Sequence, residues 1–321
     1  MAISVITEQM LRSGKDGETC YGILLLKSYT RKLTKNDKPY FEGKIQSGSA
    51  ILPIKVWNGS AAFSKMDSED YTNMVCMITG EYNQYQGNIS VVISDIAAVS
   101  GYTPEQFYEV KYNKVAYKDA LIKLCEQYVS EKGMALLNKM LFQNEDVIER
   151  FCSEFAASGH HDNCLSGLLV HTYKVSWLMS WMLATYPEIC LKEDGSKDAD
   201  KRDLYMIGAV MHDIGKIDEM HYGVYQPESA VSHRILGLDY LYQFRADIEE
   251  AYSSAWFRNF QSIIVEHHGE FADPCRTVFA YAVHNADMLD SCMTLLAQTI
   301  TEATKSGVSD SVKIDGTYLA M

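Results

Sequence analysis

The sequence of 321 residues lacks several features that mark other classes of protein. It contains no run of roughly 18 to 20 apolar residues, which a membrane-spanning helix needs. Its first ten residues have no basic segment followed by an apolar core, so we expect no secretion signal. None of its eight cysteines forms a Cys-x-x-Cys pair, which argues against a zinc knuckle or a dithiol redox site. We therefore expect reduced thiols, a cytoplasmic location and no membrane partner.

The sequence also lacks the excess of basic residues that is typical of nucleic-acid-binding proteins. Its formal net charge is −13. This charge is not spread evenly, because residues 1–100 contain ten basic and ten acidic side chains, whereas residues 101–321 contain 19 basic and 32 acidic ones. The N-terminal part is therefore the better surface for a polyanion.

The N-terminal part has the pattern of short β-strands separated by turns. Apolar and β-branched residues recur in five segments, which are residues 19–30, 40–45, 50–57, 74–79 and 88–94. Five strands with a longer, partly helical connection between the third and the fourth predict an OB-type barrel, and another small barrel or a sandwich is the alternative. We assign residues 1–100 to this domain.

Helical periodicity dominates the rest of the sequence. Thr103 followed by Pro104 is typical of the start of a helix. Apolar residues then recur at three- and four-residue steps in the segments 114–141, 145–155, 166–185, 203–212, 231–250, 257–267 and 277–303. We therefore predict that residues 101–321 form a second, all-α domain.

Histidine and aspartate residues in these helical segments carry the main chemical signal. They are His171, His212 with Asp213, His233, His267 with His268, and Asp287. A single histidine on an apolar helix face is usually a core residue, but so many buried ionisable groups are costly unless they are paired or bind a metal. A carboxylate beside a histidine can bridge two cations, and cation pairs hydrolyse phosphate esters. The sequence therefore predicts a dinuclear metallophosphohydrolase.

These motifs resemble those of the HD-domain phosphohydrolases. The matching segments are Leu168-Leu-Val-His171-Thr, His212-Asp-Ile-Gly-Lys216, His267-His-Gly269 and His284-Asn-Ala-Asp287. With an OB barrel in front of it, such a domain resembles the YhaM-like 3′-to-5′ exoribonucleases. Five further segments support this likeness, namely Lys35-Asn-Asp-Lys-Pro-Tyr40, Lys55-Val-Trp57, Thr103-Pro-Glu-Gln-Phe107, Gly159-His-His161 and Ser166-Gly-Leu-Leu169. The resemblance runs from about residue 15 to residue 295.

The resemblance implies two divalent metal ions as cofactors. The ligands of the first ion would be His171, His212, Asp213 and Asp287. The ligands of the second ion would be His233, His267 and His268, with Asp213 shared between the two. Imidazole and carboxylate donors together favour transition metals, so we expect Mn²⁺, with Fe²⁺, Co²⁺, Ni²⁺ and Zn²⁺ as alternatives.

Asp213 and Lys216 are the predicted catalytic residues. Lys216 follows the His-Asp pair by about one helical turn, from which its ammonium group can reach the centre. A cation there stabilises the charge that develops on the phosphoryl group. An ordinary surface lysine is the alternative.

Three other histidines are expected near the metal ligands. His284 lies one helical turn before Asp287, so we expect it to fix that carboxylate without binding metal itself. His160 and His161 precede the first ligand helix. We expect them to contact the scissile phosphate or the 3′-terminal sugar, and a plain loop role is the alternative.

The barrel is expected to bind the substrate. Basic and aromatic residues alternate around its first hairpin, and in single-strand-binding proteins cations follow the phosphate backbone while rings stack on bases. The predicted contacts are Lys32, Lys35, Tyr40, Tyr82 and Tyr85. Tyrosines in a barrel core and lysines in solvent are the alternative. Single-stranded RNA is the expected partner, and single-stranded DNA is a second candidate.

Three functions are compatible with these features. The leading prediction is a 3′-to-5′ exoribonuclease that releases nucleoside 5′-monophosphates. The second is a phosphodiesterase or phosphatase for a small nucleotide, although the segment after His268 continues as Gly269-Glu-Phe and lacks the Gly-Tyr-Pro motif of the cyclic-di-GMP group. The third is a nucleic-acid-binding protein with a vestigial site. No ligand residue is missing from the sequence, which argues against this third function. The oligomeric state is left open, with a homo-oligomer as one alternative.

Overall fold

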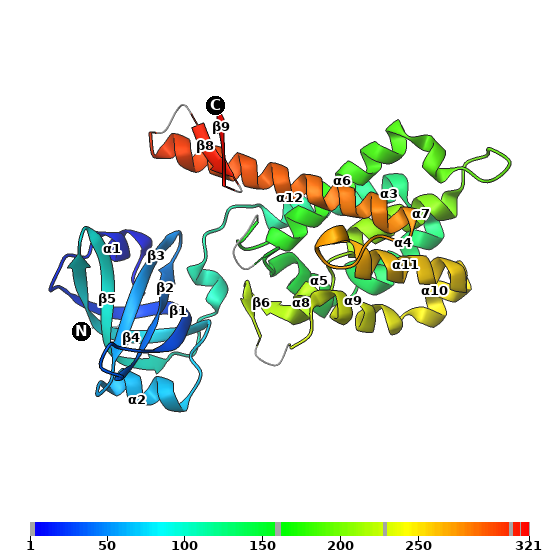
Figure 1. The fold of residues 1–321 in the computed structure, drawn as a ribbon. Coiled ribbons are helices and arrows are strands. Elements are labelled where there is room, and N and C mark those ends of the chain that lie inside the picture. Colours follow the sequence, from blue (N-terminus) through cyan, green and yellow to red (C-terminus); the bar gives the residue numbers. More distant parts are fainter. Residues whose placement is uncertain (1–3, 158–161, 227–229, 308–310, 315, 321) are drawn as a thin grey trace. The chain divides into compact units, whose positions relative to one another are not determined.

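The computed structural model describes residues 4–157, 162–226, 230–307, 311–314 and 316–320. The chain divides into two compact units, residues 1–111 and 112–321 (Figure 1). All eight cysteines are free thiols. Among the described residues, no helix combines the length and the apolar character that a bilayer crossing requires.

The first unit is a five-stranded barrel with two short helices. Its elements are α1 (Glu8–Ser13), β1 (Thr19–Leu33), β2 (Pro39–Ser47), β3 (Ala50–Trp57), α2 (Ala61–Ser68), β4 (Met74–Tyr85), β5 (Asn88–Ala98) and a 3₁₀ turn (Pro104–Phe107). The strands close in the order β1-β2-β3-β5-β4, with β1 antiparallel to β4 and β3 parallel to β5. Together with α2 between the third and fourth strands, this order confirms the predicted OB fold.

The long strand β1 pairs with two neighbours because it bends. Its first half pairs with β4 and its second half with β2, and the register with β2 shifts between Leu26 and Ser28. A bulge of this kind increases the local twist, which allows a small sheet to close. A second shift follows Thr79, where a Cβ on Gly80 would lie 2.5 Å from the carbonyl oxygen of Val92. Glycine at this position therefore permits the close approach of β5.

The segment after the barrel packs with the first unit. Phe107 is buried and its carbonyl oxygen accepts a hydrogen bond of 2.9 Å from the backbone N–H of Gly48. The hydroxyl of Tyr108 donates to Asn73 Oδ1 at 2.7 Å. These contacts explain why the division between the units falls after Lys111, whereas the sequence indicated a division after residue 100.

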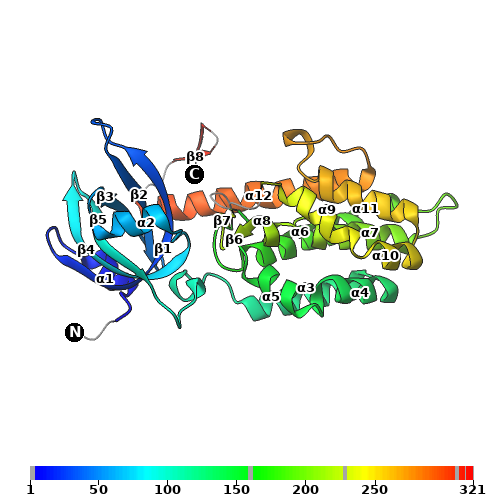
Figure 2. The same cartoon turned by 90° about the horizontal axis from the view of Figure 1, so that it is seen from below.

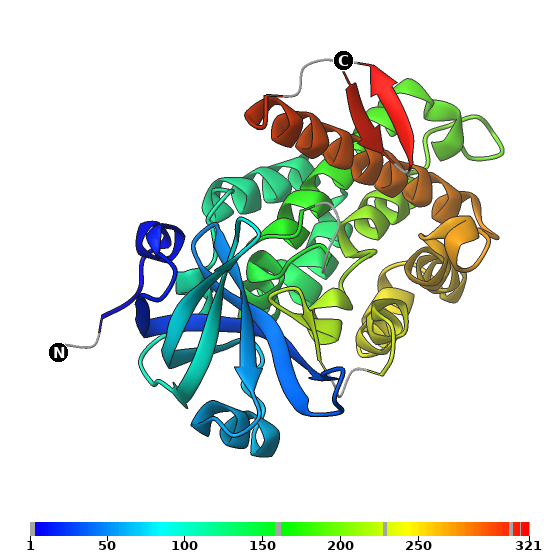
Figure 3. The same ribbon diagram turned by 60° about the vertical axis from the view of Figure 1, so that its left-hand side comes forward.

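The second unit is helical, with two short hairpins (Figure 2). Its elements are α3 (Lys114–Tyr128), α4 (Glu131–Leu137), a π-helical turn (Asn138–Phe142), α5 (Glu145–Ser153), α6 (Gly167–Thr185), a 3₁₀ turn (Pro187–Cys190), α7 (Ala199–Met211), α8 (Lys216–Glu219), β6 (Met220–His221), β7 (Val224–Tyr225), α9 (His233–Tyr242), α10 (Arg245–Ala251), α11 (Ser254–Glu266), a 3₁₀ turn (Gly269–Phe271), α12 (Val278–Lys305), β8 (Ser311–Ile314) and β9 (Thr317–Ala320). The hairpin of β8 and β9 lies beside α12 (Figure 3).

Two long helices predicted from periodicity are each broken in two. The segment 114–141 breaks at Ser130, whose hydroxyl caps α4 by accepting a hydrogen bond from Gly133 N at 3.3 Å. Asp203 of α7 holds the same serine, because the Ser130 N–H donates to Asp203 Oδ1 at 2.9 Å. The segment 231–250 is divided between α9 and α10. Apolar periodicity continues across both breaks, so it could not reveal them.

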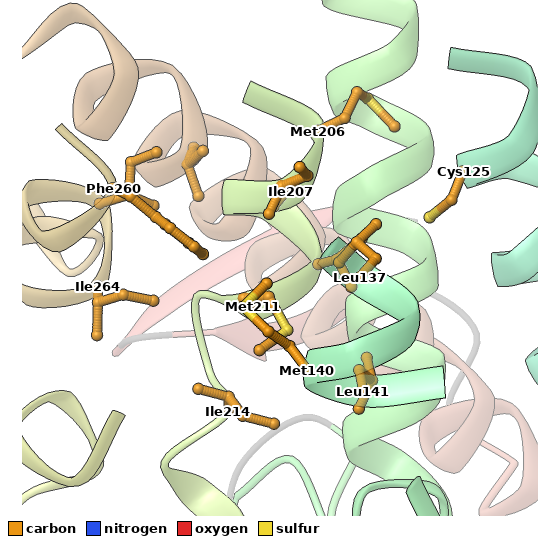
Figure 4. Close-up of a cluster of buried hydrophobic side chains, with 14 of the residues drawn as sticks. Cys125, Leu137, Met140, Leu141, Met206, Ile207, Met211, Ile214, Phe260 and Ile264 are labelled. Carbon is orange, nitrogen blue, oxygen red and sulfur yellow. The ribbon is translucent and has the colours of Figure 1, made fainter. Parts of the chain in front are cut away.

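The central helix of the second unit is α7. It contacts α3, α4, α6, α11 and α12. Figure 4 shows Met206, Ile207 and Met211 of α7 among side chains of the neighbouring elements, including Leu137, Met140, Leu141, Phe260 and Ile264. Because α7 is surrounded on all sides, the residues that follow its C-terminus begin inside the unit.

Candidate metal centre

The His-Asp motif lies in the turn that follows α7. His212 and Asp213 are both buried. The turn continues through Gly215, where a Cβ would lie only 1.9 Å from the carbonyl oxygen of His233. Because glycine has no Cβ, the first residue of α9 can approach the turn here. This backbone contact brings His233 next to Asp213.

One group of side chains lies on one side of Asp213. It consists of His171 from α6, His212 and Asp213 from the turn, and Asp287 from α12. The Nε2 atom of His171 lies 3.1 Å from Asp287 Oδ1 and 3.3 Å from His212 Nε2. The Oδ2 atom of Asp213 lies 3.3 Å from His212 Nε2 and 3.5 Å from His171 Nε2. His171, His212 and Asp213 therefore offer donor atoms within 4.8 Å of one another, and Asp287 joins this group through its contact with His171.

A second group lies around the other carboxylate oxygen of Asp213. Its Oδ1 atom is 3.4 Å from His267 Nε2 and 3.6 Å from His233 Nε2. The Nε2 atom of His268 lies 3.3 Å from His233 Nε2. All four side chains offer donor atoms within 4.8 Å of one another. The sequence separates these residues widely, and the contact of α9 and α11 brings them together.

The donor atoms fit divalent metal ions. Among the described residues, Asp213 Oδ1 and His267 Nε2 are buried without a hydrogen-bond partner. A buried polar atom without a partner costs about 1–3 kcal/mol. Two ligand atoms that are each about 2.1 Å from one ion are about 3.0 to 3.4 Å apart, which is close to the separations found here. A cation would therefore satisfy the unpaired atoms without a large rearrangement.

Two carboxylates fix two of the imidazoles from behind. The Nδ1 atom of His171 lies 2.7 Å from Asp290 Oδ2, and that of His233 lies 2.9 Å from Glu219 Oε2. Neither acid was predicted from the sequence as a site residue. Asp290 follows Asp287 by three residues and so lies on the same helix face, which is a signal that could have revealed it. No spacing rule links Glu219 to its histidine.

Two backbone carbonyl groups fix two more imidazoles. The Nδ1 atoms of His212 and His267 lie 2.8 Å and 2.9 Å from the carbonyl oxygens of Ala209 and Ile264. Each Nδ1–H therefore donates to a fixed acceptor, which selects the tautomer with a free Nε2 lone pair. All four of these Nε2 atoms lie at the centre described above.

The two groups differ in their electrostatics. Burial alone would lower the pKa of His171, but the three carboxylates that contact it raise this pKa well above its usual value. In the second group, burial lowers the pKa of His268 to about 3 and also lowers the pKa of His267. The lowered pKa values favour neutral His267 and His268, the form that binds metals, whereas the carboxylates around His171 favour positive charge there.

Lys216 lies directly beside Asp213. Its Nζ atom is 2.6 Å from Asp213 Oδ2 and donates to the carbonyl oxygen of Ala156 at 2.7 Å. Burial would lower the pKa of Lys216, but the neighbouring carboxylate reverses this effect and raises it. Burial would likewise raise the pKa of Asp213, and the positive charges around it lower this pKa well below its usual value. Lys216 is therefore placed at the centre, and its role in the reaction stays a prediction.

His284 is positioned differently from the expectation. Its Nδ1 atom lies 2.7 Å from the carbonyl oxygen of His267. Its ring also packs on Gly269, which has a φ of +57° and where a Cβ would lie 2.5 Å from the ring. Because α12 contacts both α6 and α11, residues one turn apart on it face different helices. His284 therefore supports the backbone of the second group, whereas it was expected to fix the carboxylate of Asp287.

The loop before α6 is anchored at Asp162. His160 and His161 lie outside the described residues, so their predicted contacts with substrate are not assessed. Asp162 is buried, and it accepts hydrogen bonds from the Tyr112 hydroxyl at 2.6 Å and from Lys174 Nζ at 2.9 Å. These bonds tie Asp162 to the segment just before α3 and to α6.

The exposed residues predicted to bind substrate lie on the hairpins of the barrel. Lys35 is exposed in the turn between β1 and β2, and Tyr85, which is 71% exposed, ends β4. Lys32 is also exposed but forms an ion pair with Glu42 on the neighbouring strand. The structure leaves these side chains accessible.

Tyr40 forms part of an aromatic pair on the barrel surface. Its ring centroid lies 5.1 Å from that of Trp57, with an angle of 32° between the ring planes. Lys55 Nζ lies 5.6 Å from the centroid of the Trp57 ring. The sequence analysis did not name these two residues as substrate contacts, because their proximity to Tyr40 depends on the pairing of β2 with β3.

Tyr82 is not available for stacking on a base. It is only 5% exposed and belongs to the core of the barrel. Its ring lies so close to Gly14 that a Cβ there would be 2.3 Å away. The prediction for Tyr82 was wrong because this residue occupies one of the inward-facing positions of β4. The alternative, a tyrosine in the barrel core, therefore holds for Tyr82.

Comparison with known proteins agrees with the organisation of the chain. The model of the HD domain matches residues 168–303, a range that includes both groups of ligand candidates. The helical unit therefore contains an HD domain, as predicted.

Nearly the whole chain is similar to proteins named 3′-5′ exoribonuclease YhaM. The protein of Oceanobacillus iheyensis is 24% identical over 301 residues, which cover 88% of this chain and 87% of that protein. The protein of Bacillus subtilis is 23% identical over 302 residues, which cover 91% and 90%. These relatives confirm the resemblance seen in the motifs.

Solved structures also include similar chains. The mitochondrial single-stranded DNA-binding protein Rim1 of S. cerevisiae has a TM-score of 0.23 and 16% identity, and the likeness covers 26% of this chain and 96% of that chain.

Proposed function

We propose that this chain is a metal-dependent 3′-to-5′ exoribonuclease that releases nucleoside 5′-monophosphates from single-stranded RNA. The observation that carries the proposal is the Asp213 carboxylate, whose two oxygens face two separate groups of imidazoles. The similarity to named 3′-5′ exoribonucleases supports it, because that similarity spans both units. Single-stranded DNA is a second candidate substrate, since stacking and phosphate contacts do not require a 2′-hydroxyl group.

In this proposal two divalent ions bind on the two sides of Asp213. The first is held by His171, His212 and Asp287, and the second by His233, His267 and His268. Mixed nitrogen and oxygen donors favour transition metals, and we propose Mn²⁺, with Fe²⁺, Co²⁺, Ni²⁺ and Zn²⁺ as alternatives. Asp213 would be the ligand that the two ions share.

The chain's own residues would supply orientation and a fixed positive charge. When bound, such ions supply a water of lowered pKa and neutralise phosphate oxygens. The partners of the Nδ1 atoms keep the imidazoles in place, so little reorganisation accompanies the reaction. Lys216 has three N–H donors, two of which are directed to Asp213 and Ala156. We assign the third to a phosphoryl oxygen, where it would stabilise the developing charge.

The direction of cleavage determines the product. Attack of water on the terminal phosphorus forms one P–O bond and breaks the bond to the upstream 3′ oxygen, which takes up a proton. The phosphate then remains on the 5′ side of the released nucleoside, and the shortened strand again ends in a 3′-hydroxyl group. A terminal 3′-phosphate should therefore hinder the enzyme.

The barrel would guide the strand. Tyr40, Trp57 and Tyr85 offer exposed or half-buried rings to unpaired bases, and Lys35 and Lys55 offer positive charge to the backbone. Since a duplex does not expose the faces of its bases, a stable double-stranded segment should stop the enzyme near the junction.

The central test is degradation of 5′-labelled single-stranded RNA by the Mn²⁺-loaded protein. We expect a ladder of products shortened from the 3′ end, and nucleoside 5′-monophosphates among the small products. Asp213→Ala should abolish the ladder. Asp218→Ala is the matched control, because it removes an exposed carboxylate from the same region and should leave the ladder unchanged. Release of nucleoside 3′-phosphates, or cleavage of circular RNA as fast as linear RNA, would contradict the proposal.

A further inference from the structure

An apolar surface lies on the outside of the helical unit, where α6 and α12 contact each other. We define this α6–α12 face by four residues, Trp177 and Trp181 of α6 and Leu289 and Met293 of α12. They are 51%, 49%, 46% and 53% exposed. In each helix the two residues are four positions apart and so lie on one side of it. Trp177, Leu289 and Met293 line one cavity, and Trp181 follows Trp177 by one turn on the same side of α6.

The same two helices lack charged residues along this face. No Asp, Glu, Lys or Arg occurs in residues 175–187 or in residues 291–301. A helix at the surface of a globular protein normally has a charged or polar face toward solvent, and a helix that is apolar on all sides is normally buried. On a chain with a net charge of −13, two uncharged helical stretches side by side are unusual for a face that remains in water.

The second half of α12 also exposes apolar residues. The buried residues of α12 all lie between Phe279 and Asp290, and none of residues 291–305 is buried. This half nevertheless contains Leu295, Leu296 and Ile300 in addition to Met293. The described residues of the chain therefore leave these apolar side chains less buried than such side chains normally are.

A cavity opens on this face. Its volume is about 560 Å³, and its lining includes Tyr173, Trp177, Leu289 and Met293. The polar groups at its floor already have partners, since Lys174 Nζ donates to Asp162 Oδ2 at 2.9 Å and to Thr294 Oγ1 at 3.0 Å. The cavity therefore suits an apolar or aromatic group that makes no ion pair, and it is large enough for an indole ring.

We propose that the α6–α12 face joins two copies of this chain, and that Trp181 of each copy fills the cavity of the other. A two-fold interface uses the same patch on both subunits, and this patch has a protruding aromatic residue and a cavity one helical turn apart. This exchange would bury the exposed ring of Trp181 and fill the cavity in each copy. It is independent of the reaction that the metal centre catalyses.

The size of the surface is consistent with a dimer. A half-exposed tryptophan offers on the order of 100 Å². With Leu289 and Met293, the face offers on the order of 300 to 400 Å² of apolar area, which is the size at which patches on single chains are often functional. A stable interface covers about 800 Å² on each partner. The uncharged stretches 175–187 and 291–301 supply the surrounding contact area.

RNA is a poorer occupant of this face than a second copy. A bound strand needs cations along its backbone. The uncharged stretches contain none, and Lys174, the nearest basic residue of α6, is engaged with Asp162. The carboxylate of Asp290 at the cavity would repel a phosphate group.

Sedimentation velocity of the full-length protein over a range of concentrations tests the proposal. We expect a species of twice the chain mass of 36.2 kDa. Leu289→Lys places a charge in the face, and Trp181→Ala removes the inserted ring. Each should weaken the dimer on the order of 30-fold or more, because central aromatic and apolar anchors dominate interfaces. Val115→Lys is the matched control, since Val115 is 66% exposed and lies on α3, and it should leave the dimer intact.

Thiol labelling gives a second readout that needs no substitution. Cys292 is the exposed cysteine of the chain and stands next to Met293. In the dimer a maleimide should label Cys292 slowly, and dilution below the dissociation constant should speed up labelling. A wild-type chain that stays monomeric at all concentrations overturns the proposal. A dimer that both Leu289→Lys and Trp181→Ala leave unchanged overturns it as well, because the interface would then lie elsewhere.

Discussion

The two units place their ionisable side chains in opposite ways. In the helical unit, His171, Asp213 and His267 are buried at the centre of the fold. In the barrel, Lys32 and Lys35 lie on the surface. Charge is also divided unequally, with ten basic and ten acidic residues in residues 1–100 against 19 and 32 in residues 101–321. The acidic excess therefore belongs to the unit that contains the candidate metal centre.

This difference reflects what each unit has to do. Burial of carboxylates and imidazoles costs free energy unless a partner or a cation compensates, so it occurs where fixed geometry matters. The Nδ1 atoms of His171 and His233 are held by Asp290 and Glu219, which leaves little freedom. Surface lysines and tyrosines keep their rotamer freedom and can adapt to successive nucleotides. Four experiments test this difference between the two units.

The largest effect is expected at the shared carboxylate. Asp213→Ala removes the ligand common to both groups, so turnover should fall by more than the roughly 10- to 100-fold that changes outside the ligand set cause. Metal content per chain should fall as well. Elemental analysis and single-turnover RNA degradation measure these effects. Normal activity in the variant would mean that the chemistry does not take place at this centre.

Deletion of residues 1–111 separates the two units. The helical unit has its own core, so hydrolysis of a small chromogenic phosphodiester should persist. Affinity for single-stranded RNA should fall on the order of 10²-fold, because each stacked base contributes about 1–3 kcal/mol. The dependence of RNA affinity on salt should also weaken, since phosphate-contacting lysines are lost. Equal RNA binding by the truncated and intact chains would show that the barrel has another role.

Asp290→Asn tests a residue that touches neither metal nor substrate in the proposal. Loss of the carboxylate behind His171 should lower metal affinity about 10- to 100-fold, and Glu219→Gln should do the same at the second group. Competition with a chelating dye measures both. Asp95→Asn in the barrel is the matched control, because Asp95 is half exposed and pairs with Lys65. If Asp95→Asn lowered metal affinity as strongly as Asp290→Asn does, the burial of ionisable side chains would not be what distinguishes the two units.

The smallest effect is a contrast between two tyrosines of β4. Tyr85→Ala should weaken RNA binding by about 1–3 kcal/mol and leave stability nearly unchanged, because the ring is exposed. Tyr82→Ala should mainly destabilise the barrel, by about 3–5 kcal/mol, because it leaves a cavity in the core. Thermal unfolding and RNA titration of both variants distinguish these outcomes. Unchanged stability of Tyr82→Ala would restore this residue as a candidate for stacking.

Features that depend on interactions between neighbouring residues could be predicted from the sequence, whereas features that depend on contacts between distant residues could not. The strands and helices were largely predictable because periodicity and caps are local, as at Thr103 and Pro104. The break at Ser130 was not, because the tertiary contact between Ser130 and Asp203 decides it. His284 was expected at Asp287 from helical spacing alone, and it faces the end of α11 instead.

The residue types alone show which metal donors are available, since adjacent His212 and Asp213 and paired His267 and His268 have few structural uses besides metal binding. The residue pattern also predicts the two classes of secondary structure. The packing of the elements settles which donors face each oxygen of Asp213, that Asp290 and Glu219 stand behind two of them, and that Tyr82 is core while Tyr85 is surface. The physical reason is that spacing along a chain fixes directions within one element, whereas distances between elements depend on packing, as at Gly215 against α9.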